Sequence, residues 1–426
     1  MIPALALSAL VAALPAGLDV PAEITFEDAI RIARDSSPDV AIANAGVDAA
    51  RAQVLAAGAI PNPTATFMAG WSSQCSDPGC TLPAYVATLG DQGAVAAILT
   101  GQRGLAVDAA VQGTRGAEES RRDVMRNLEY GVKRQFVATS VAWRAVGYAR
   151  LEAAHANDAV ALGRKRQAAG EIPAAELSRL ELLRLSVEQI VDRAELAHEQ
   201  SRVALAQLLG LRDGAPAFTV VAGPTASAAP PPQLTDMTLP KLTAEAQRRR
   251  PDLAAARAAV EEARALAALA RRQVIPQFQI LAQYGQQGAP GGWFTPPTAS
   301  LGISLALPVF YQQQGQIGAA DAGVAAAEAT VAKVEAQVVA DVAGAFATYQ
   351  SSRRTARRAE EQVRSLSSNV RESVGSDYAK GTASLLDYLD TERSRIQHEI
   401  EYLGTLQTFW TSVFQLERAV GVNFVP

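Results

Sequence analysis

Few residues in this sequence have types and spacing that suit chemistry. The clearest candidates are two acidic side chains near its end. Asp387 and Asp390 stand three positions apart in a stretch without proline, so they share one face of a predicted helix. Carboxylates gathered on one surface attract cations and repel anions. The alternative interpretation is a pair of solvated carboxylates on an exposed helix face.

Cys75 and Cys80 are the only cysteines, and they flank Ser-Asp-Pro-Gly. In an exported chain a small disulfide across this turn would stabilise the fold by about 2 kcal/mol on the loop-entropy estimate. Two free thiols are the second possibility. A metal site is the third, although no histidine lies nearby in the sequence and the spacing matches no zinc pattern.

Signatures of enzymes are missing from the sequence. The three histidines, His155, His198 and His398, all stand in predicted helices and far apart. The sequence has no GxSxG nucleophile elbow, no P-loop and no HExxH pair. We therefore expect no enzymatic activity, no cofactor and no metal site. The formal net charge of −4 and the lack of a basic run with interleaved aromatics argue against nucleic acid as a partner.

The chain contains a tandem repeat. Four pairs of landmarks align at a nearly constant offset: Pro38 with Pro251 and Pro63 with Pro276 at 213 residues, Gly170 with Gly381 and Gly210 with Gly421 at 211 residues. The repeats extend over about 25–210 and 241–422. A Pro-, Gly- and Ala-rich linker at 211–240 separates them.

Each repeat predicts long helices, because apolar residues recur every three or four positions through stretches that lack proline. The predicted helices cover 39–60, 104–168, 174–209, 251–274, 315–378 and 384–420. A helix of about 65 residues reaches roughly 100 Å. Two shorter helices placed end to end match that length. We therefore expect a wall of long helices that alternate with stacked pairs of short ones.

Between the helices, each repeat predicts two β-strands, at 63–72 and 85–99 and at 276–287 and 298–310. Phe278, Ile280 and Tyr284 share one face of their strand, and Phe67 and Trp71 hold the corresponding positions in the first repeat. The strand at 85–99 alternates poorly, since Asp91 and Gly93 fall where apolar residues are expected.

This alternation suits strands with lipid on one side and water on the other, with Trp71 and Tyr284 at the membrane interface. A soluble sandwich with one buried face is the alternative. Single-chain outer-membrane barrels begin at eight strands, and an open edge is not tolerated in lipid. Several copies of this chain would therefore have to share one barrel.

Residues 1–18 are apolar and uncharged, although Pro3 and Pro15 interrupt them. They predict a secretory signal peptide, with an ordinary N-terminal helix as the alternative. Elsewhere no run of about 18 apolar residues occurs, so the sequence predicts no transmembrane helix.

With these features the sequence resembles the outer-membrane efflux protein family that includes TolC, over residues 25 to 422. The repeat, GAIPNPT before the first strand and SLALPVFYQQQGQIGAADAGVAAAEA after the last strand carry the resemblance. The last stretch and Asn62-Pro63 are more similar to the CzcC-type heavy-metal branch than to TolC itself. The resemblance implies a mainly α protomer with four strands in a trimeric, twelve-stranded transmembrane β-barrel and long helices in a periplasmic α-barrel.

The family resemblance also implies a function and a location. It implies an exit duct in the outer membrane, extending into the periplasm, that passively conducts substrate for a tripartite efflux or secretion system. Its partners would be two further copies, a periplasmic adaptor (membrane fusion protein), an inner-membrane pump of the RND type, and outer-membrane lipid. Metal ions, drugs and other solutes all stay open as cargo. The rival interpretations are a periplasmic adaptor and a soluble coiled-coil scaffold, neither of which needs duplicated lipid-facing strand pairs.

The same resemblance assigns a periplasmic gate. YAKGTASLLDYLD, from Tyr378, is similar to the turn and helix at the closed tip of these channels. In a trimer Asp387 and Asp390 would give six carboxylates around the axis. Glu176 and Arg179, at the corresponding positions of the first repeat, could pair with these aspartates. Ala383 stands where TolC has an arginine that helps to hold the tip shut.

The two turns that connect the long helices are the predicted docking sites for the adaptor. Their residues are Ala169, Gly170 and Glu171 in the first repeat and Lys380, Gly381 and Thr382 in the second. Glycine permits the tight reversal between helices. A plain helical hairpin would have the same sequence pattern, so this assignment depends on the resemblance.

Overall fold

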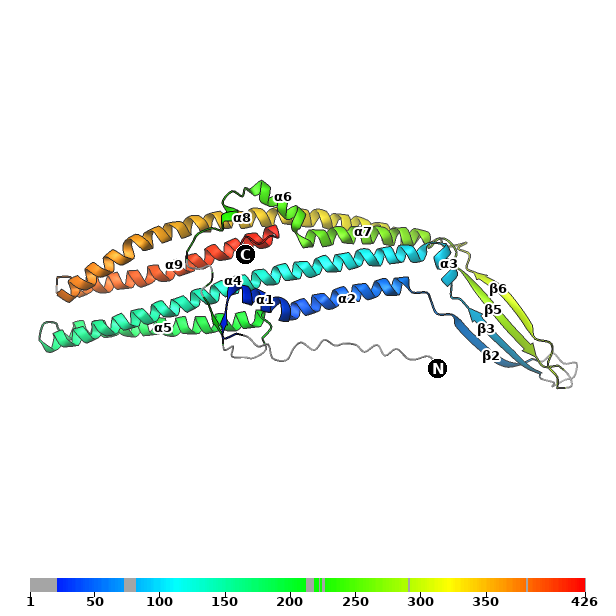
Figure 1. Ribbon diagram of the computed structural model, residues 1–426, viewed down its shortest axis with the longest axis horizontal. Helices are drawn as coiled ribbons and strands as arrows, with labels where there is room; N and C mark the ends of the chain where they lie inside the picture. Colours follow the sequence, from blue (N-terminus) through cyan, green and yellow to red (C-terminus); the bar gives the residue numbers. More distant parts are fainter. Residues whose placement is uncertain are drawn as a thin grey trace. The chain divides into compact units, whose positions relative to one another are not determined.

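The computed structural model describes residues 21–72, 82–211, 218–221, 223, 227–289, 292–380 and 382–425 (Figure 1). The predicted signal peptide and both cysteines lie outside these residues. The chain divides into two units: one comprises 1–43, 122–250 and 336–426, and the other comprises 44–121 and 251–335.

Long helices dominate the described residues, as the sequence predicts. The helices that flank the turns and strands are α2 (Pro38–Gly58), α4 (Gln102–Ala168), α5 (Ala174–Leu208), α7 (Pro251–Arg272), α8 (Gln314–Lys380) and α9 (Leu385–Val420). The helices α4 and α8 contain 67 residues each. Among the described residues, no helix is both long enough and apolar enough to cross a bilayer.

Two shorter helices, which the sequence analysis missed, also follow the repeat. They are α1 (Phe26–Ser36) and α6 (Leu239–Arg249), offset by the same 213 residues. Gly210 and Gly421 have positive φ angles of 76° and 80°. A Cβ atom at Gly210 would meet the backbone of Ser36, and one at Gly421 would meet that of Arg249. Each repeat therefore ends with a glycine that lies against the end of its own short helix.

The larger unit has its core where these short helices meet the long ones. The two-residue strands β1 (Glu23–Ile24) and β4 (Thr219–Val220) pair in parallel, and η2 (Pro232–Leu234) is a 3₁₀ turn. Phe136 is fully buried, and its ring lies 5.4 Å from that of Phe26. Part of the predicted linker thus belongs to this core.

A buried ion pair holds the end of the chain to α4. Lys133 Nζ lies 2.7 Å from Glu417 Oε2, and both side chains are less than 5% exposed. The other oxygen of Glu417 accepts hydrogen bonds of 2.7 Å from the backbone N–H groups of Phe424 and Val425. These two bonds supply the partners that a buried carboxylate requires.

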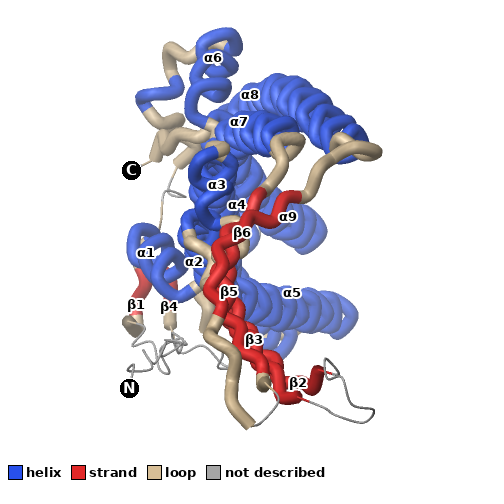
Figure 2. Tube along the Cα trace, turned by 90° about the vertical axis from the view of Figure 1, so that its right-hand side faces the viewer, coloured by secondary structure: helices blue, strands red, loops and turns tan. Residues whose placement is uncertain are grey.

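The smaller unit carries a four-stranded antiparallel sheet in the order β2-β3-β5-β6 (Figure 2). Its strands are β2 (Thr64–Ser72), β3 (Leu82–Gly90), β5 (Phe278–Gln287) and β6 (Thr298–Leu305). Within the described residues, no other strand pairs with β2 or β6, so both edges of the sheet are open.

Two strand predictions were too long. The predicted strand at 85–99 ends at Gly90, and Ala94–Leu99 form the helix α3. The carboxylate of Asp91 accepts hydrogen bonds from the N–H groups of Gly93 and Val95, which turns the chain into a helix. The predicted strand at 298–310 ends at Leu305, before Pro308, which cannot donate a ladder hydrogen bond.

Candidate functional site

The register of the sheet sorts its side chains into two faces, because residues directly opposite each other point to the same side. Phe67, Ala87, Tyr284 and Ala299 form one such row across all four strands. The face that contains this row, called the apolar face, consists of Ala65, Phe67, Ala69, Trp71, Pro83, Tyr85, Ala87, Leu89, Phe278, Ile280, Ala282, Tyr284, Gln286, Ala299, Leu301, Ile303 and Leu305. The opposite face is rich in Thr, Ser, Gln and Gly, and none of the four strands of this sheet contains a charged residue. All five residues predicted to face lipid lie on the apolar face.

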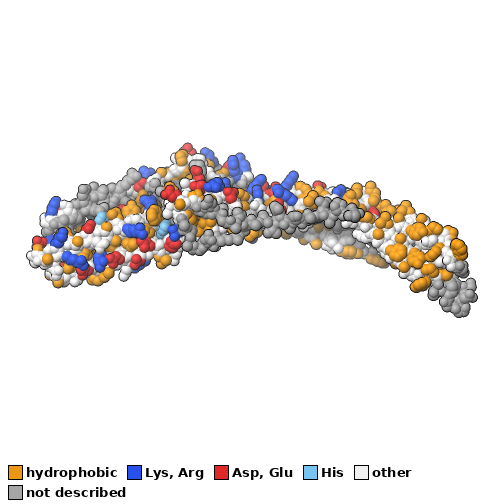
Figure 3. Space-filling model, turned by 60° about the horizontal axis from the view of Figure 1, so that its bottom comes forward, with side chains coloured by type: hydrophobic (Ala, Val, Ile, Leu, Met, Phe, Trp, Pro, Cys, Tyr) orange, Lys and Arg blue, Asp and Glu red, His pale blue; other side chains and the backbone are white. Residues whose placement is uncertain are grey.

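The apolar face is open to its surroundings in a single chain. Phe67 is 70% exposed, Trp71 76% and Leu301 78%, while Phe278 and Ile280 are half-buried. Figure 3 shows hydrophobic side chains gathered over the end that carries the strands. Tyr85, which the sequence analysis did not select, lies between Phe67 and Phe294, with ring centroids 6.3 and 5.9 Å away. An exposed apolar surface of this kind needs an apolar environment.

The turn between α4 and α5 contains the first predicted docking residues. Gly170 has a φ angle of 77°, which only glycine adopts without strain. The N–H of Glu171 donates to the carbonyl of Arg166 at 2.9 Å, the bond that closes a Schellman motif. The Glu171 carboxylate also pairs with the Arg166 side chain at 3.2 Å. Glycine therefore sets the sharp reversal, and an ion pair spans it.

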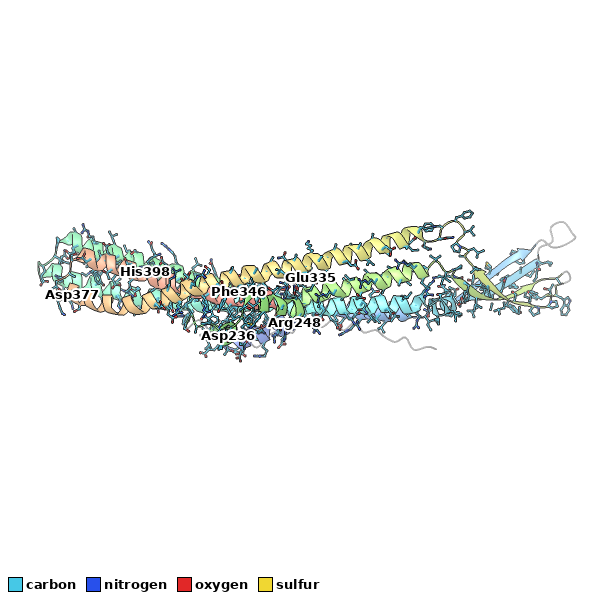
Figure 4. All side chains as sticks on the ribbon, turned by 90° about the horizontal axis from the view of Figure 1, so that it is seen from above. Asp236, Arg248, Glu335, Phe346, Asp377 and His398 are labelled. Atoms are coloured by element: carbon cyan, nitrogen blue, oxygen red, sulfur yellow. The ribbon has the colours of Figure 1, made fainter. Side chains whose placement is uncertain are left out.

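The turn between α8 and α9 repeats this backbone pattern at an offset of 211 residues. The N–H of Thr382 donates to the carbonyl of Asp377 at 2.8 Å, and the Thr382 hydroxyl donates to the same carbonyl at 3.0 Å. Figure 4 labels Asp377 near the end of α8. Gly381 and the side chain of Tyr378 lie outside what the structure describes.

An apolar cluster brings these two turns together within one unit. Ala159, Val160 and the fully buried Leu180 form its centre. Ala383, Tyr388 and Leu389, from the second turn and α9, pack against that centre. Both turns lie at the same end of the unit (Figure 1). At Ala383 a methyl group in an apolar contact thus takes the position where the resemblance expects an arginine.

The predicted gate carboxylates are both exposed, and they differ in their surroundings. Asp387 lies in the first turn of α9, which Ser384 caps: the Asp387 N–H donates to Ser384 Oγ at 3.2 Å, and that hydroxyl donates to the Asp387 carboxylate at 2.7 Å. Asp390 lies one turn further along. In the described part of one chain, no ion pair joins Arg179 to either aspartate, and Glu176 lies half-buried in the first turn of α5.

An ion cluster that the sequence did not reveal lies further along the same helices. The Arg395 guanidinium on α9 contacts the carboxylates of Glu392, at 3.0 Å, and of Glu152 on α4. Burial disfavours the charged guanidinium, but its hydrogen bonds to both carboxylates outweigh that effect and raise the pKa of Arg395. The cluster borders a cavity of about 410 Å³ between α4, α5 and α9. Only the spacing of Glu392 and Arg395 was visible in the sequence.

Comparison with known proteins identifies the family. Residues 29–211 and 242–422 match the family model for outer membrane efflux proteins. The chain belongs to the outer membrane efflux protein family. The two matched segments correspond to the two repeats, so this membership accounts for the duplication as well as the fold.

Two curated relatives are similar along much of the chain. The cobalt-zinc-cadmium resistance protein CzcC of Cupriavidus metallidurans is 21% identical over 401 residues, which cover 93% of this chain and 90% of CzcC. The outer membrane protein OprJ of Pseudomonas aeruginosa is 25% identical over 322 residues, covering 74% of this chain and 65% of OprJ.

Solved channel structures share the fold. CusC superposes with a TM-score of 0.76 at 18% identity, covering 93% of this chain and 92% of CusC. VceC of Vibrio cholerae superposes with a TM-score of 0.70 at 20% identity, covering 94% of this chain and 97% of VceC. The MtrE channel of Neisseria gonorrhoeae superposes with a TM-score of 0.73 at 21% identity, covering 93% of this chain and 89% of MtrE.

These comparisons confirm the predicted family, fold class and general function. The protein is an outer-membrane efflux channel of the tripartite type, it extends into the periplasm, and it is not an enzyme. Channels with this TolC-like fold are trimeric and work with tripartite pumps. The rival interpretations as a periplasmic adaptor or a coiled-coil scaffold were wrong.

Proposed function

We propose that this channel is the passive exit duct of a metal-ion efflux system. The observation that carries the proposal is the extent of its similarity to CzcC, which spans nine-tenths of both chains, whereas the similarity to OprJ covers 65% of that protein. Export of organic drugs is the second candidate, because identity to OprJ is higher over the shorter match.

Growth of a deletion strain separates these two cargoes. The gene is deleted from its host, and growth is measured in rising Zn²⁺, Co²⁺ and Cd²⁺ and, separately, in rising concentrations of several drugs. The proposal expects a lower tolerance of the metals that a plasmid copy restores. Lower tolerance of drugs alone would overturn it in favour of the second candidate.

The aspartates at the start of α9 are the proposed gate. A trimer would gather six exposed carboxylates from Asp387 and Asp390, and such a ring favours cations. Arg179 and Glu176 are proposed to act with them across neighbouring copies. In planar bilayers, replacing both aspartates by alanine should lower the preference for cations. The matched control is Ser384→Ala, which removes the cap of α9 and keeps both carboxylates. Unchanged ion selectivity in the double variant would exclude Asp387 and Asp390 from the bore.

The two helix turns are the proposed docking surface for a periplasmic adaptor, which links the channel to an inner-membrane pump of the RND type. Glu171, Lys380 and Thr382 are exposed at these turns. Photo-crosslinking residues at positions 171 and 380 should capture the adaptor in cells. Position 196, where an exposed Leu lies in the middle of α5, is the matched control. Equal capture at 196 would argue against docking at the turns.

The sheet is the proposed membrane anchor. Its open edges at β2 and β6 would pair between three copies into one twelve-stranded barrel, with Phe67, Trp71, Phe278, Ile280 and Tyr284 toward lipid. A disulfide between Cys75 and Cys80 stays a prediction. Heat-sensitive migration of the purified protein as a trimer would support the shared barrel, and a stable monomer in membranes would exclude it.

A further inference from the structure

The short helix α3 exposes its large apolar side chains and buries its small ones. Leu99 is 73% exposed, Ile98 50% and Val95 37%, and these three positions share one helix face. Ala94 and Ala96, by contrast, are almost fully buried. A helix at a water-facing surface places its larger aliphatic residues against the protein. The reversed arrangement of α3 therefore indicates an apolar environment on its outer face.

Hydrogen bonds fix α3 to the end of the sheet. Asp91 Oδ2 accepts from the N–H of Val95 at 3.1 Å, and Asp91 Oδ1 accepts from the N–H of Ile280 on β5 at 2.9 Å. The backbone N–H of Asp91 in turn donates to the carbonyl of Ile280 at 3.2 Å. One carboxylate thus joins the start of α3 to the neighbouring strand, and the exposed face is held in a defined position.

The order of the strands limits what can cover this face. β3, which leads into α3, is an inner strand of the sheet, and only β2 and β6 have open edges. Neighbouring copies would join at those edges, away from β3. The segment after β6 also exposes Phe310, at 98%, but it follows an edge strand, so a neighbouring copy could cover it. For α3, lipid is the occupant that fits best.

We infer that α3 is an interfacial helix, with Val95, Ile98 and Leu99 inserted between phospholipids of the periplasmic leaflet of the outer membrane. The chain continues from α3 directly into the long helix α4, which places this end of the sheet on the periplasmic side. Interfacial helices bind by burying their apolar face at the boundary between headgroups and acyl chains. This inference rests on the proposal that the apolar face of the sheet contacts lipid.

Spin labels in a background with Cys75→Ser and Cys80→Ser test the inference. Single cysteines at positions 95, 98 and 99 carry the label, and only material that migrates as a trimer is reconstituted, in phosphatidylethanolamine and phosphatidylglycerol vesicles. Collision with oxygen reports lipid, and collision with a water-soluble nickel complex reports water. Position 301 on the apolar face and position 92, an exposed Gln before α3, are the lipid and water references.

The expected result is an oxygen-to-nickel ratio several-fold higher at positions 98 and 99 than at 92, and close to that at 301. A ratio at 98 and 99 equal to that at 92, with 301 still in lipid, would overturn the interfacial helix and leave the barrel intact. Nickel access at 301 as well would overturn the membrane anchor itself. Labels at 98 and 99 that neither reagent reaches would show that protein covers the helix, which also overturns the inference.

Discussion

The two repeats build the same pair of helices beside the sheet and hold them together differently. In the second repeat three arginines on α7, spaced by seven residues, pair with acids on α8: Arg257 with Glu335, Arg264 with Glu328 and Arg271 with Asp321, at 2.6–3.0 Å. In the first repeat Arg51 pairs with Glu118, Arg121 donates to the Asn44 side chain, and Arg103 donates to the carbonyl of Gly58.

This difference shows which features the duplication retains. The backbone pattern persists, including the bond that closes each helix turn, from Glu171 to Arg166 and from Thr382 to Asp377. The side-chain pairs have diverged, since an ion pair spans the first turn and a threonine hydroxyl supports the second. Exposed pairs contribute only about 0–1 kcal/mol each, so they can change without loss of the fold.

The largest effect is expected where the repeats meet and not within either one. Glu417→Ala leaves the buried Lys133 without its counter-charge, with only the Asn423 side chain to accept from it, and breaking a buried ion pair typically costs about 3–5 kcal/mol. Thermal unfolding of the purified channel, or its loss from the membrane fraction, measures the change. Arg264→Ala, which removes an exposed pair, is the control. A small effect of Glu417→Ala would show that the repeats are joined mainly by apolar contacts.

A glycine that only the first repeat contains should give the next largest effect. Gly163 corresponds to Val374 in the second repeat, and a Cβ at Gly163 would lie 2.6 Å from Leu180 Cδ1. Gly163→Val should therefore cost about 1–3 kcal/mol through overpacking. Gly147→Val, in the same helix but with no atom within 4 Å of its Cβ, is the matched control and should be nearly neutral. Equal midpoints of thermal unfolding for the two variants would contradict this packing.

The three ion pairs between α7 and α8 should contribute little to stability. Arg264→Ala, Glu328→Ala and the double variant form a cycle whose coupling energy is expected at about 0.2–1 kcal/mol, because both side chains are half exposed. Salt should reduce it further. The cycle for Arg51 and Glu118 should give a similar value. A coupling energy between Arg264 and Glu328 well above that between Arg51 and Glu118 would mean that the three ion pairs of the second repeat act as a network.

The smallest effect concerns the two short helices. Thr25 and Asp28 form a capping box at the start of α1, whereas Thr238 gives α6 no side-chain cap. The hydrogen bond from Arg31, with that from Thr25, holds the pKa of Asp28 below its usual value of 3.8. The stabilisation is thus present above pH 3.8 and is lost as the pH falls through the lower pKa of the folded state. Protection factors against hydrogen exchange, which correct for the intrinsic slowing of exchange at low pH, should fall over that range more in α1 than in α6, and Asp28→Asn should remove the difference.

The accuracy of the predicted elements followed the length of their periodic patterns. Long amphipathic stretches set the bounds of α4, α5, α8 and α9 to within a few residues, because periodicity accumulates over many turns. The short helices α1 and α6, of eleven residues each, were missed although both are strongly amphipathic, and the capping box of Thr25 and Asp28 was a local signal for the start of α1. At Asp91 the interrupted alternation was noticed, but the helix that follows was not predicted, although the carboxylate that starts it accepts from the nearby N–H groups of Gly93 and Val95. What a local pattern cannot show is the hydrogen bond from the Ile280 N–H, which joins Asp91 to β5.

The candidate sites divide in the same way. The alternation of side chains placed Phe67 on the apolar face of its strand and Tyr284 on the apolar face of another. Only the register shows that the two residues share a row across the sheet. Glycine at position 170 predicted a tight turn, since its positive φ is a local property. The packing of Ala383 beside Leu180, by contrast, depends on where residues far apart in the sequence lie in space. The cap that joins Ser384 to Asp387 is again local, since the two residues stand three positions apart.

By itself the sequence determined the duplication, the family and the order of helices and strands. All of these are properties of residues close together in the chain or repeated at a fixed offset. The tertiary structure decided which faces coincide, which charges are buried, such as Lys133 and Glu417, and which apolar side chains on α3 are left uncovered. Burial and pairing arise from contacts between residues far apart in sequence, and their free energies depend on the three-dimensional surroundings of each group.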